Sequence, residues 1–119
     1  MQPEAGKLLE DIRQAADRIA RYVADRPWEE YATNDFLRSA VERQFTIIGE
    51  ALAQLTRRDP EVASRITAHR QIVDFRNVLT HVYDSVDDEV VWDAVVSKLP
   101  VLQCEVQALL VQAEGDEPV

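Results

Sequence analysis

The longest regular pattern in this 119-residue sequence is an apolar repeat between residues 36 and 55. The hydrophobic side chains recur every three or four residues, at Phe36, Leu37, Ala40, Val41, Phe45, Ile48, Leu52 and Leu55. That spacing places them on one face of a helix, which needs other elements to cover it. Thr33 or Asn34 can cap this helix, and Asp35 puts a negative charge in its first turn. We therefore predict a helix that runs to about Arg57.

Three further segments show helical spacing, at residues 4–25, 67–83 and from about 88 onward. The first ends at Asp25-Arg26-Pro27, because proline disfavours the helical conformation in the residue before it. Thr67 is a candidate cap for the segment 67–83. Pro100 lies inside the last segment and is expected to kink or split it. The chain is thus predicted to be all-α, an antiparallel bundle of four main helices.

Shorter features complete this organisation. Trp28 and Tyr31 are expected to lie in a short connection and to cover the end of the core. Asp59-Pro60 is typical of the start of a short helical turn, with Asp59 as its cap. The length favours a single domain over residues 1–119, in which residues 114–119 form a frayed acidic tail.

Composition excludes several classes of function. With only three glycines, neither of the common glycine-rich phosphate-binding motifs can be formed. Cys104 is the only cysteine, so an intrachain disulfide and a cysteine-based zinc site are both excluded. The first ten residues lack the apolar core of a signal peptide, and no run of 18 apolar residues is present. We expect a cytoplasmic protein with no membrane span, no metal and no cofactor.

The net charge of −9 argues against nonspecific binding of nucleic acid, but the charge is uneven. Residues 1–83 carry 12 Lys and Arg against 13 Asp and Glu, whereas residues 84–119 carry one Lys against nine acids. The acidity therefore belongs to the C-terminal part, and the stretch 57–81 is mildly basic.

That basic stretch ends in a cluster of polar groups, Arg76-Asn77-Val78-Leu79-Thr80-His81-Val82-Tyr83. On a helix, Arg76 and Tyr83 lie on nearly the same face, and Asn77 and His81 share the neighbouring stripe. The cluster combines a fixed cation, a group that titrates near neutrality and a phenol. Because the surrounding residues are apolar, the Arg and His need a partner, a substrate or solvent. Both could equally be ordinary surface residues.

A phosphodiester is one candidate target for these groups. In RNA the substrate brings its own nucleophile, the 2′-hydroxyl, so no metal is required. A positioned imidazole such as His81 can move the proton, and the Arg76 guanidinium can bind the phosphate and stabilise developing charge. No second His, and no paired carboxylate at ligand spacing, lies near His81 to offer a metal site.

At these residues the chain resembles HepT-like toxins of the HEPN superfamily. Arg76-(four residues)-His81-Val82-Tyr83 matches their Arg-x4–6-His-x-Tyr signature. Residues 42–51 and 72–81 resemble the blocks that precede and enter the motif, and Val91-Trp92 through Leu99-Pro100 resembles the stretch after it. The resemblance covers roughly residues 5–112.

The resemblance implies an all-α homodimer that brings two copies of the motif together in a cleft. It implies a metal-independent RNase in which Arg76 and His81 carry out cleavage and Asn77 has a supporting role. It also implies a partner, a small nucleotidyltransferase antitoxin of the MNT type, which transfers AMP to Tyr83. The stretch Ile47-Ile48-Gly49 is the best internal indication of the dimer, because its glycine permits close contact between helices.

Two other interpretations remain open at this point. The chain could be a non-catalytic binding module, serving the nucleotidyltransferase as its substrate or regulatory subunit. It could also be a purely structural helical bundle, without nuclease activity, modification or a transferase partner.

Overall fold

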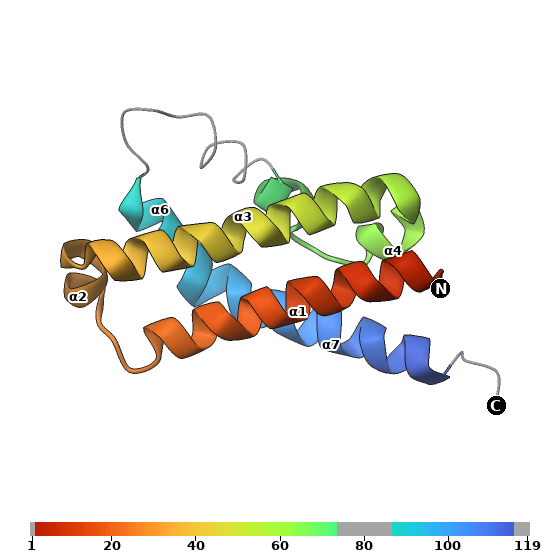
Figure 1. The fold of residues 1–119 in the computed structure, drawn as a ribbon, viewed down its shortest axis with the longest axis horizontal. Helices are drawn as coiled ribbons and strands as arrows, with labels where there is room; N and C mark the ends of the chain where they lie inside the picture. The colour runs from red at the N-terminus through yellow and green to blue at the C-terminus, as the bar shows by residue number, and fades with distance from the viewer. Residues whose placement is uncertain (1, 74–86, 116–119) are drawn as a thin grey trace.

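A computed structural model describes residues 2–73 and 87–115, and this part of the chain contains helices and turns but no strand (Figure 1). The elements in chain order are α1 (Pro3–Val23), α2 (Trp28–Thr33), α3 (Asp35–Arg58), α4 (Pro60–Ser64), α6 (Asp88–Asp93), the π-helical turn η1 (Ala94–Lys98) and α7 (Leu99–Gly115). Residues 69–73 are also helical. The prediction of an all-α fold is confirmed.

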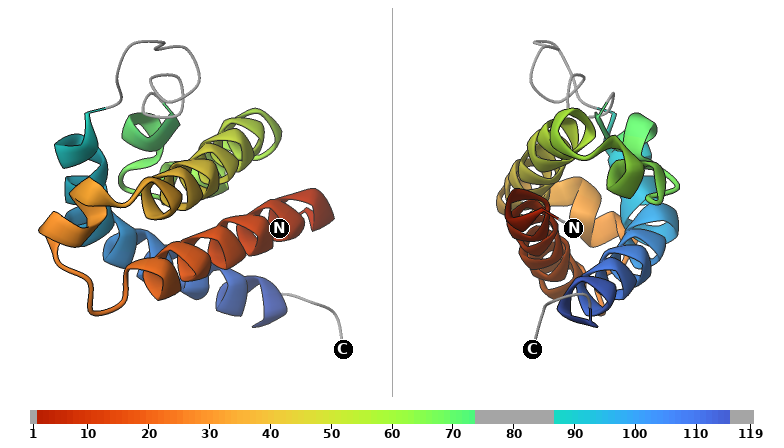
Figure 2. Two further views of the ribbon diagram at one scale, coloured as in Figure 1. Left: turned by 60° about the vertical axis from the view of Figure 1, so that its left-hand side comes forward. Right: turned by 90° about the vertical axis from the view of Figure 1, so that its right-hand side faces the viewer.

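The three long helices α1, α3 and α7 run lengthwise through a molecule of 50 × 30 × 19 Å. Helix α1 packs against both α3 and α7, and the end-on view in Figure 2 shows the helices arranged around one interior. The buried side chains form one hydrophobic core, to which each of the labelled elements contributes. The single-domain organisation of residues 1–119 remains a prediction.

The helix ends follow the predicted chemistry. Asp25 adopts a positive φ of 61°, and the chain turns there between α1 and α2. The Asn34 side chain accepts a hydrogen bond from the Leu37 amide at 3.0 Å, which satisfies a free N–H in the first turn of α3. Asp59 caps α4 in the same way.

The aromatic connection differs in detail from its prediction, because Trp28 to Thr33 form the short helix α2. The predicted covering role is observed. The rings of Trp28, Tyr31 and Trp92 lie 5.1 to 6.4 Å apart, and Tyr31 is completely buried. These three aromatic rings close one end of the core and join α2 to α6.

Phe36 was predicted to belong to the apolar face of α3, and this is wrong. Its side chain is 90% exposed, whereas that of Leu37, the next residue, is 7% exposed. One residue is a rotation of about 100° on a helix, which is enough to move Phe36 off the buried face.

Two further expectations are corrected by long-range contacts and by burial. Thr67 does not act as a helix cap, since its amide and hydroxyl both donate to the Glu105 carboxylate on α7.

The stretch proposed for dimer contact, Ile47-Ile48-Gly49, is largely internal. Ile48 and Gly49 are buried within the protomer, which leaves only Ile47 half-buried at the surface.

Pro100 explains the π-helical turn. The Leu99 amide donates to the Ala94 carbonyl, five residues earlier, so the turn before the proline is widened. Proline lacks an N–H and its ring clashes with the carbonyl four residues back in a regular helix. The predicted split of the last helix is thus observed as α6, η1 and α7.

Residues 88–115 are the one described stretch with the length and apolar composition of a membrane span. A third of the relevant window is buried inside the protein. Core helices of soluble proteins satisfy the same two criteria, so length and composition do not distinguish between the two here.

Candidate functional site

The predicted catalytic and modification residues, Arg76, Asn77, His81 and Tyr83, lie outside the described residues. The structure therefore does not test whether these four groups come together. It does describe the chain on either side of the motif, up to Val73 and again from Asp87.

The entry to the motif is anchored on α7. The Thr67 hydroxyl donates to the Glu105 carboxylate at 2.6 Å, and Arg65 donates to Gln112 at 3.0 Å. His69 contacts the Ile66 carbonyl through Nδ1 at 3.0 Å, so this histidine has a partner within its own turn. The helix of residues 69–73 that leads to the motif starts from a fixed position.

The exit from the motif is anchored on α3. The Asp87 side chain accepts hydrogen bonds from the Glu89 and Val90 amides and so caps α6. Asp88 forms an ion pair with Arg38, with 3.6 Å between Oδ2 and Nε. The same guanidinium donates to the Ala32 carbonyl, so Arg38 joins the end of α2 and the starts of α3 and α6.

Next to this junction lie two acidic groups with shifted pKa values. Burial raises the pKa of the Glu42 carboxyl, and the charge of Asp88 adds to the effect, while Arg38 opposes it. Burial also raises the pKa of the Tyr31 phenol, whose hydroxyl has no hydrogen-bond partner among the described residues. A raised pKa means that ionising either group is less favourable here than in water, so the junction is costly to charge.

This gives a stability prediction for Glu42→Gln. Because the folded pKa of Glu42 lies above its unfolded value, its contribution is favourable at low pH and is lost as the pH rises through the folded pKa. The amide cannot ionise, so we expect the variant to gain on the order of 0.5 kcal/mol at pH 7, given partial screening by solvent. Urea unfolding at pH 7 and at pH 4 measures this difference.

The exposed Glu50→Gln, on the same helix, serves as the control and should show no such gain at neutral pH. At pH 4, where Glu42 is largely protonated, the gain from Glu42→Gln should shrink. An equal gain at both pH values would show that its cause is not the ionisation of Glu42.

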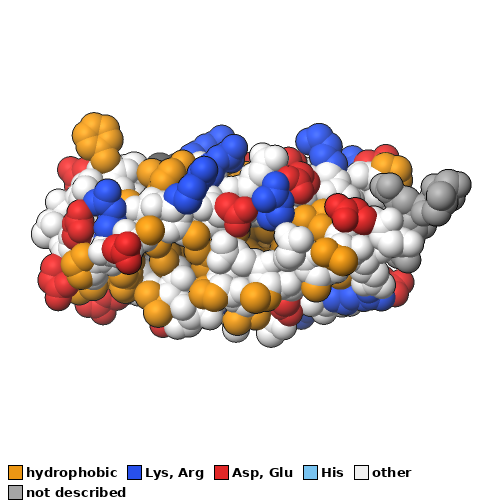
Figure 3. Space-filling model, turned by 90° about the horizontal axis from the view of Figure 1, so that it is seen from below, with side chains coloured by type: hydrophobic (Ala, Val, Ile, Leu, Met, Phe, Trp, Pro, Cys, Tyr) orange, Lys and Arg blue, Asp and Glu red, His pale blue; other side chains and the backbone are white. Residues whose placement is uncertain are grey.

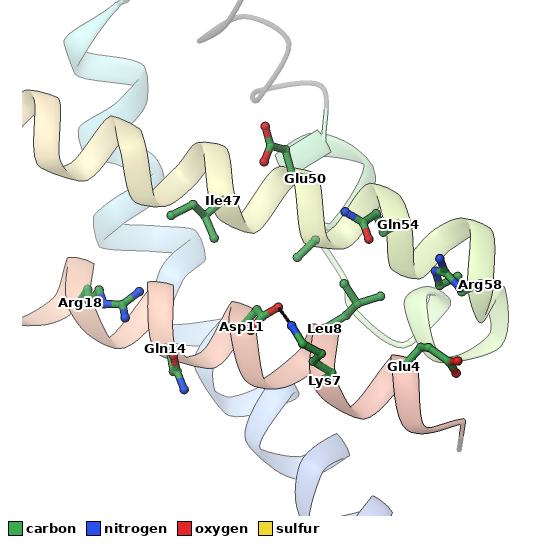
Figure 4. Close-up of a pocket in the computed structure, with 11 residues that line it drawn as sticks. Glu4, Lys7, Leu8, Asp11, Gln14, Arg18, Ile47, Glu50, Gln54 and Arg58 are labelled. Atoms are coloured by element: carbon green, nitrogen blue, oxygen red, sulfur yellow. Dashed lines mark hydrogen bonds and ion pairs between the residues drawn. The ribbon is translucent and has the colours of Figure 1, made fainter.

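A surface groove lies between α1 and α3 and has a volume of about 370 Å³ (Figure 4). Arg18 and Arg58 stand at its two ends, and Lys7 pairs with Asp11 at 3.3 Å along one side. The groove contains neither histidine nor cysteine. It offers no proton-transfer group suited to neutral pH, so the motif remains the better candidate for catalysis.

Metal chemistry finds no support in the same part of the chain. Among residues 2–73 and 87–115, no three His, Cys, Asp or Glu side chains are grouped so that they could hold a metal ion. The prediction that the protein needs no metal remains untested by this observation.

The fold of the described residues is an all-α bundle whose chain is anchored on α7 before the motif and on α3 after it. The family described as "Ribonuclease HepT-like" matches residues 12–109. The chain belongs to this family, which confirms the resemblance drawn from the motif.

Named relatives agree with this assignment. The chain is 30% identical to "Probable ribonuclease HepT" of Thermococcus cleftensis over 105 residues, which cover 85% of this chain and 91% of the relative. It is 29% identical to "Putative RNase MJ1380" of Methanocaldococcus jannaschii over 83% of this chain and 90% of the relative. No solved structure matches the chain significantly.

A further relative from M. jannaschii, "Gamma-glutamylcyclotransferase and putative RNase MJ0434", is 27% identical over 92% of this chain. The chain spans only about half of that protein, 49% of its length. The similarity is therefore confined to one part of a longer protein.

Sequence reasoning missed the residues that anchor the motif. Arg38 pairs with Asp88, and Glu105 pairs with Thr67. The partners are up to 50 residues apart in the chain, and nothing in a single sequence predicts either contact. The only local indication of this junction was the four-residue spacing of Arg38 and Glu42, which makes the two side chains neighbours on one helix.

Proposed function

We propose that this protein is the toxin of a toxin–antitoxin pair, a metal-independent endoribonuclease of the HepT-like family. The observation that carries the proposal is the motif Arg76-x4-His81-x-Tyr83 in a chain that matches this ribonuclease family over residues 12–109. The names of its relatives support the same class of activity.

Cleavage proceeds by transfer within the RNA. The 2′-hydroxyl gives up its proton to solvent as its oxygen attacks the adjacent phosphorus, the bond to the 5′-oxygen breaks, and a 2′,3′-cyclic phosphate and a 5′-hydroxyl result. His81 donates the proton that the departing 5′-oxygen needs, and Arg76 stabilises the negative charge on the phosphate. Asn77 supports this arrangement. No metal or cofactor takes part in any step.

Control comes from a nucleotidyltransferase antitoxin of the MNT type. The Tyr83 oxygen attacks the α-phosphorus of ATP, and pyrophosphate leaves, so that AMP becomes attached to the phenol. The added phosphate places negative charge two residues from His81 in sequence, where it competes with the RNA phosphate for the cationic groups. The toxin acts as a cytoplasmic homodimer in which two copies of the motif share one cleft.

Expression of the chain alone is expected to arrest bacterial growth, and co-expression of a nucleotidyltransferase antitoxin of the MNT type should relieve the arrest. Intact-mass measurement of the co-expressed protein should then show added AMP units. Tyr83→Phe, which removes only the acceptor oxygen, should prevent both the mass increase and the relief. Tyr22→Phe, at a half-buried tyrosine on α1, is the matched control.

The same experiment separates the proposal from its main alternative, a non-catalytic regulatory subunit of the transferase. A chain that binds and is modified by the transferase, yet never slows growth or cleaves RNA, would be such a subunit. A chain that neither slows growth nor interacts with the transferase would be a structural bundle.

A further inference from the structure

The charges of the described residues are distributed unevenly along the molecule. The end that carries α2 and the start of α6, residues 25–38 and 87–93, contains eight acids and two arginines. Figure 3 shows acidic side chains gathered at this end, which lies on the left in Figure 1 as well. Residues 54–73, which lead from the last turns of α3 to the motif, contain four arginines and two acids. A positive region therefore precedes the motif in a chain with a net charge of −9.

Both acids of this positive region already have partners. The Asp59 carboxylate accepts a hydrogen bond from the Val62 amide at 3.3 Å. The Glu61 carboxylate accepts one from the Arg65 guanidinium at 3.2 Å. Neither acid is therefore available to neutralise the other three arginines of the region.

Those three arginines, Arg57, Arg58 and Arg70, are exposed and form no ion pair or hydrogen bond with any described residue. Elsewhere in the described chain, Arg13 and Arg38 each pair with two carboxylates. A guanidinium without a carboxylate partner can form paired hydrogen bonds to a phosphate group. The three side chains therefore have the chemistry of phosphate contacts.

The position of Arg57 and Arg58 in the last turn of α3 has a structural explanation as well, because a helix C-terminus favours nearby cations. That explanation does not extend to Arg70, which lies in the separate helix of residues 69–73. After α4 the chain turns back, so that this second helix lies alongside α3 in Figures 1 and 2. Cations from two elements thus line the approach to the motif.

We propose that Arg57, Arg58 and Arg70 form a phosphate-binding track for the RNA strand that the motif cleaves. The inference rests on the proposed function and adds a substrate class, single-stranded RNA of several nucleotides held through its backbone. Residues 54–73 contain no Phe, Tyr or Trp on which a base could stack. Phosphate contacts fix the position of a strand but carry no sequence information. The track should therefore hold RNA of any sequence.

The acidic end of the molecule gives the bound strand a direction. Asp25, Glu29 and Glu89 are exposed there and form no ion pair with any described residue. Their charges repel a polyanion, whereas the track attracts it. The strand should therefore extend from the motif toward the end of α3 and not toward α2. This separation of charge allows an acidic protein to bind RNA at one place.

The number of contacts predicts the size of the effect. In single-stranded nucleic acid, each phosphate contact contributes about −0.7 to the slope of log K against log salt concentration. Loss of the Arg57 and Arg58 contacts should therefore reduce the magnitude of the slope by about 1.4. With a contribution that vanishes near 1 M salt, the affinity at 0.1 M salt should fall about 25-fold.

The test is binding of a fluorescently labelled RNA of about 12 nucleotides to the full chain, followed by anisotropy at ~0.05 to ~0.5 M salt. Every 2′-hydroxyl of this probe is methylated, so the motif cannot cleave it. Arg57→Gln/Arg58→Gln should show the loss in affinity and in slope given above. Arg57→Lys/Arg58→Lys keeps both charges and should retain most of the affinity.

Arg70→Gln is an independent variant on the second helix and should reduce the slope by about 0.7. The matched control is Arg18→Gln/Arg21→Gln, which removes the same charge as the double variant but from α1. Figure 4 places Arg18 and Arg58 at opposite ends of the groove. Exposed charges are largely screened beyond about 10 Å at 0.1 M salt, so the control should keep its affinity within about twofold.

Cleavage of RNA with free 2′-hydroxyls provides a second measurement. For a strand of about 12 nucleotides, Arg57→Gln/Arg58→Gln should raise KM about 25-fold and change kcat little. The loss should shrink on a dinucleotide, which is too short to extend along the track. A chain that binds the methylated probe through these arginines but cleaves no RNA would refute the proposed function and leave the track in place.

Three outcomes would overturn the inference. Equal affinity and salt slope in the parent chain and in Arg57→Gln/Arg58→Gln would show that these arginines do not contact RNA. An equal loss in Arg18→Gln/Arg21→Gln would indicate an effect of net charge alone. Loss of binding to the MNT-type transferase, with RNA binding unchanged, would show that the arginines contact a protein partner instead.

Discussion

His81→Ala is expected to lower RNA cleavage at least about a hundredfold, because it removes the group that protonates the departing 5′-oxygen. The chain contains only one other histidine, which provides a matched control. His69 binds the Ile66 carbonyl within its own turn and lies before the motif, so His69→Ala should retain most of the activity. The comparison shows whether activity depends on the His81 imidazole in particular or falls whenever a histidine is removed.

The measurement is cleavage of a single-stranded RNA by the purified protein, with and without EDTA, followed by analysis of the new ends. Transfer through the 2′-hydroxyl predicts 2′,3′-cyclic phosphate and 5′-hydroxyl ends, and EDTA should not slow the reaction. Arg76→Ala should reduce the rate by a similar factor, since it removes charge stabilisation of the phosphate. Full activity of both variants would refute the assignment of the motif, and inhibition by EDTA would refute metal independence.

Local patterns predicted most of this fold correctly. The apolar periodicity of α1 and α3, the caps at Asn34 and Asp59 and the interruption at Pro100 each depend on residues within one or two helical turns. Such features are readable because the interacting groups are close together in the sequence. The π-helical form of the interruption at Pro100 could not be predicted from the sequence, since a kink and a widened turn both relieve the clash of a proline ring.

Contacts between distant residues were the part that the sequence did not reveal. Thr67 has the chemistry of a helix cap, but the Glu105 carboxylate on α7 offers its amide and hydroxyl a charged acceptor. Phe36 is a large apolar residue of the kind found in a core, but the periodicity does not show where the buried face of α3 ends. The catalytic assignment rests on the motif and the family alone, and it stays a prediction until the variants are tested.

Leu52→Ala is expected to cost about 2–5 kcal/mol of folding free energy, the usual range for a buried leucine cut back to alanine. Leu52 is completely buried on α3, in the core that α3 shares with α1 and α7. For a chain of this length the loss corresponds to a fall in Tm of roughly 10–20 °C. Thermal unfolding followed by circular dichroism measures it, and a single transition would support one cooperative domain.

Phe36→Ala on the same helix removes a larger side chain but should change the stability by no more than about 0.5 kcal/mol, because Phe36 is 90% exposed. Alanine has the highest helix propensity, so helix formation itself should not suffer in either variant. The difference between the two therefore measures burial rather than side-chain size. Equal losses would mean that Phe36 is covered in solution, and a second transition in Leu52→Ala would mean that the core is divided.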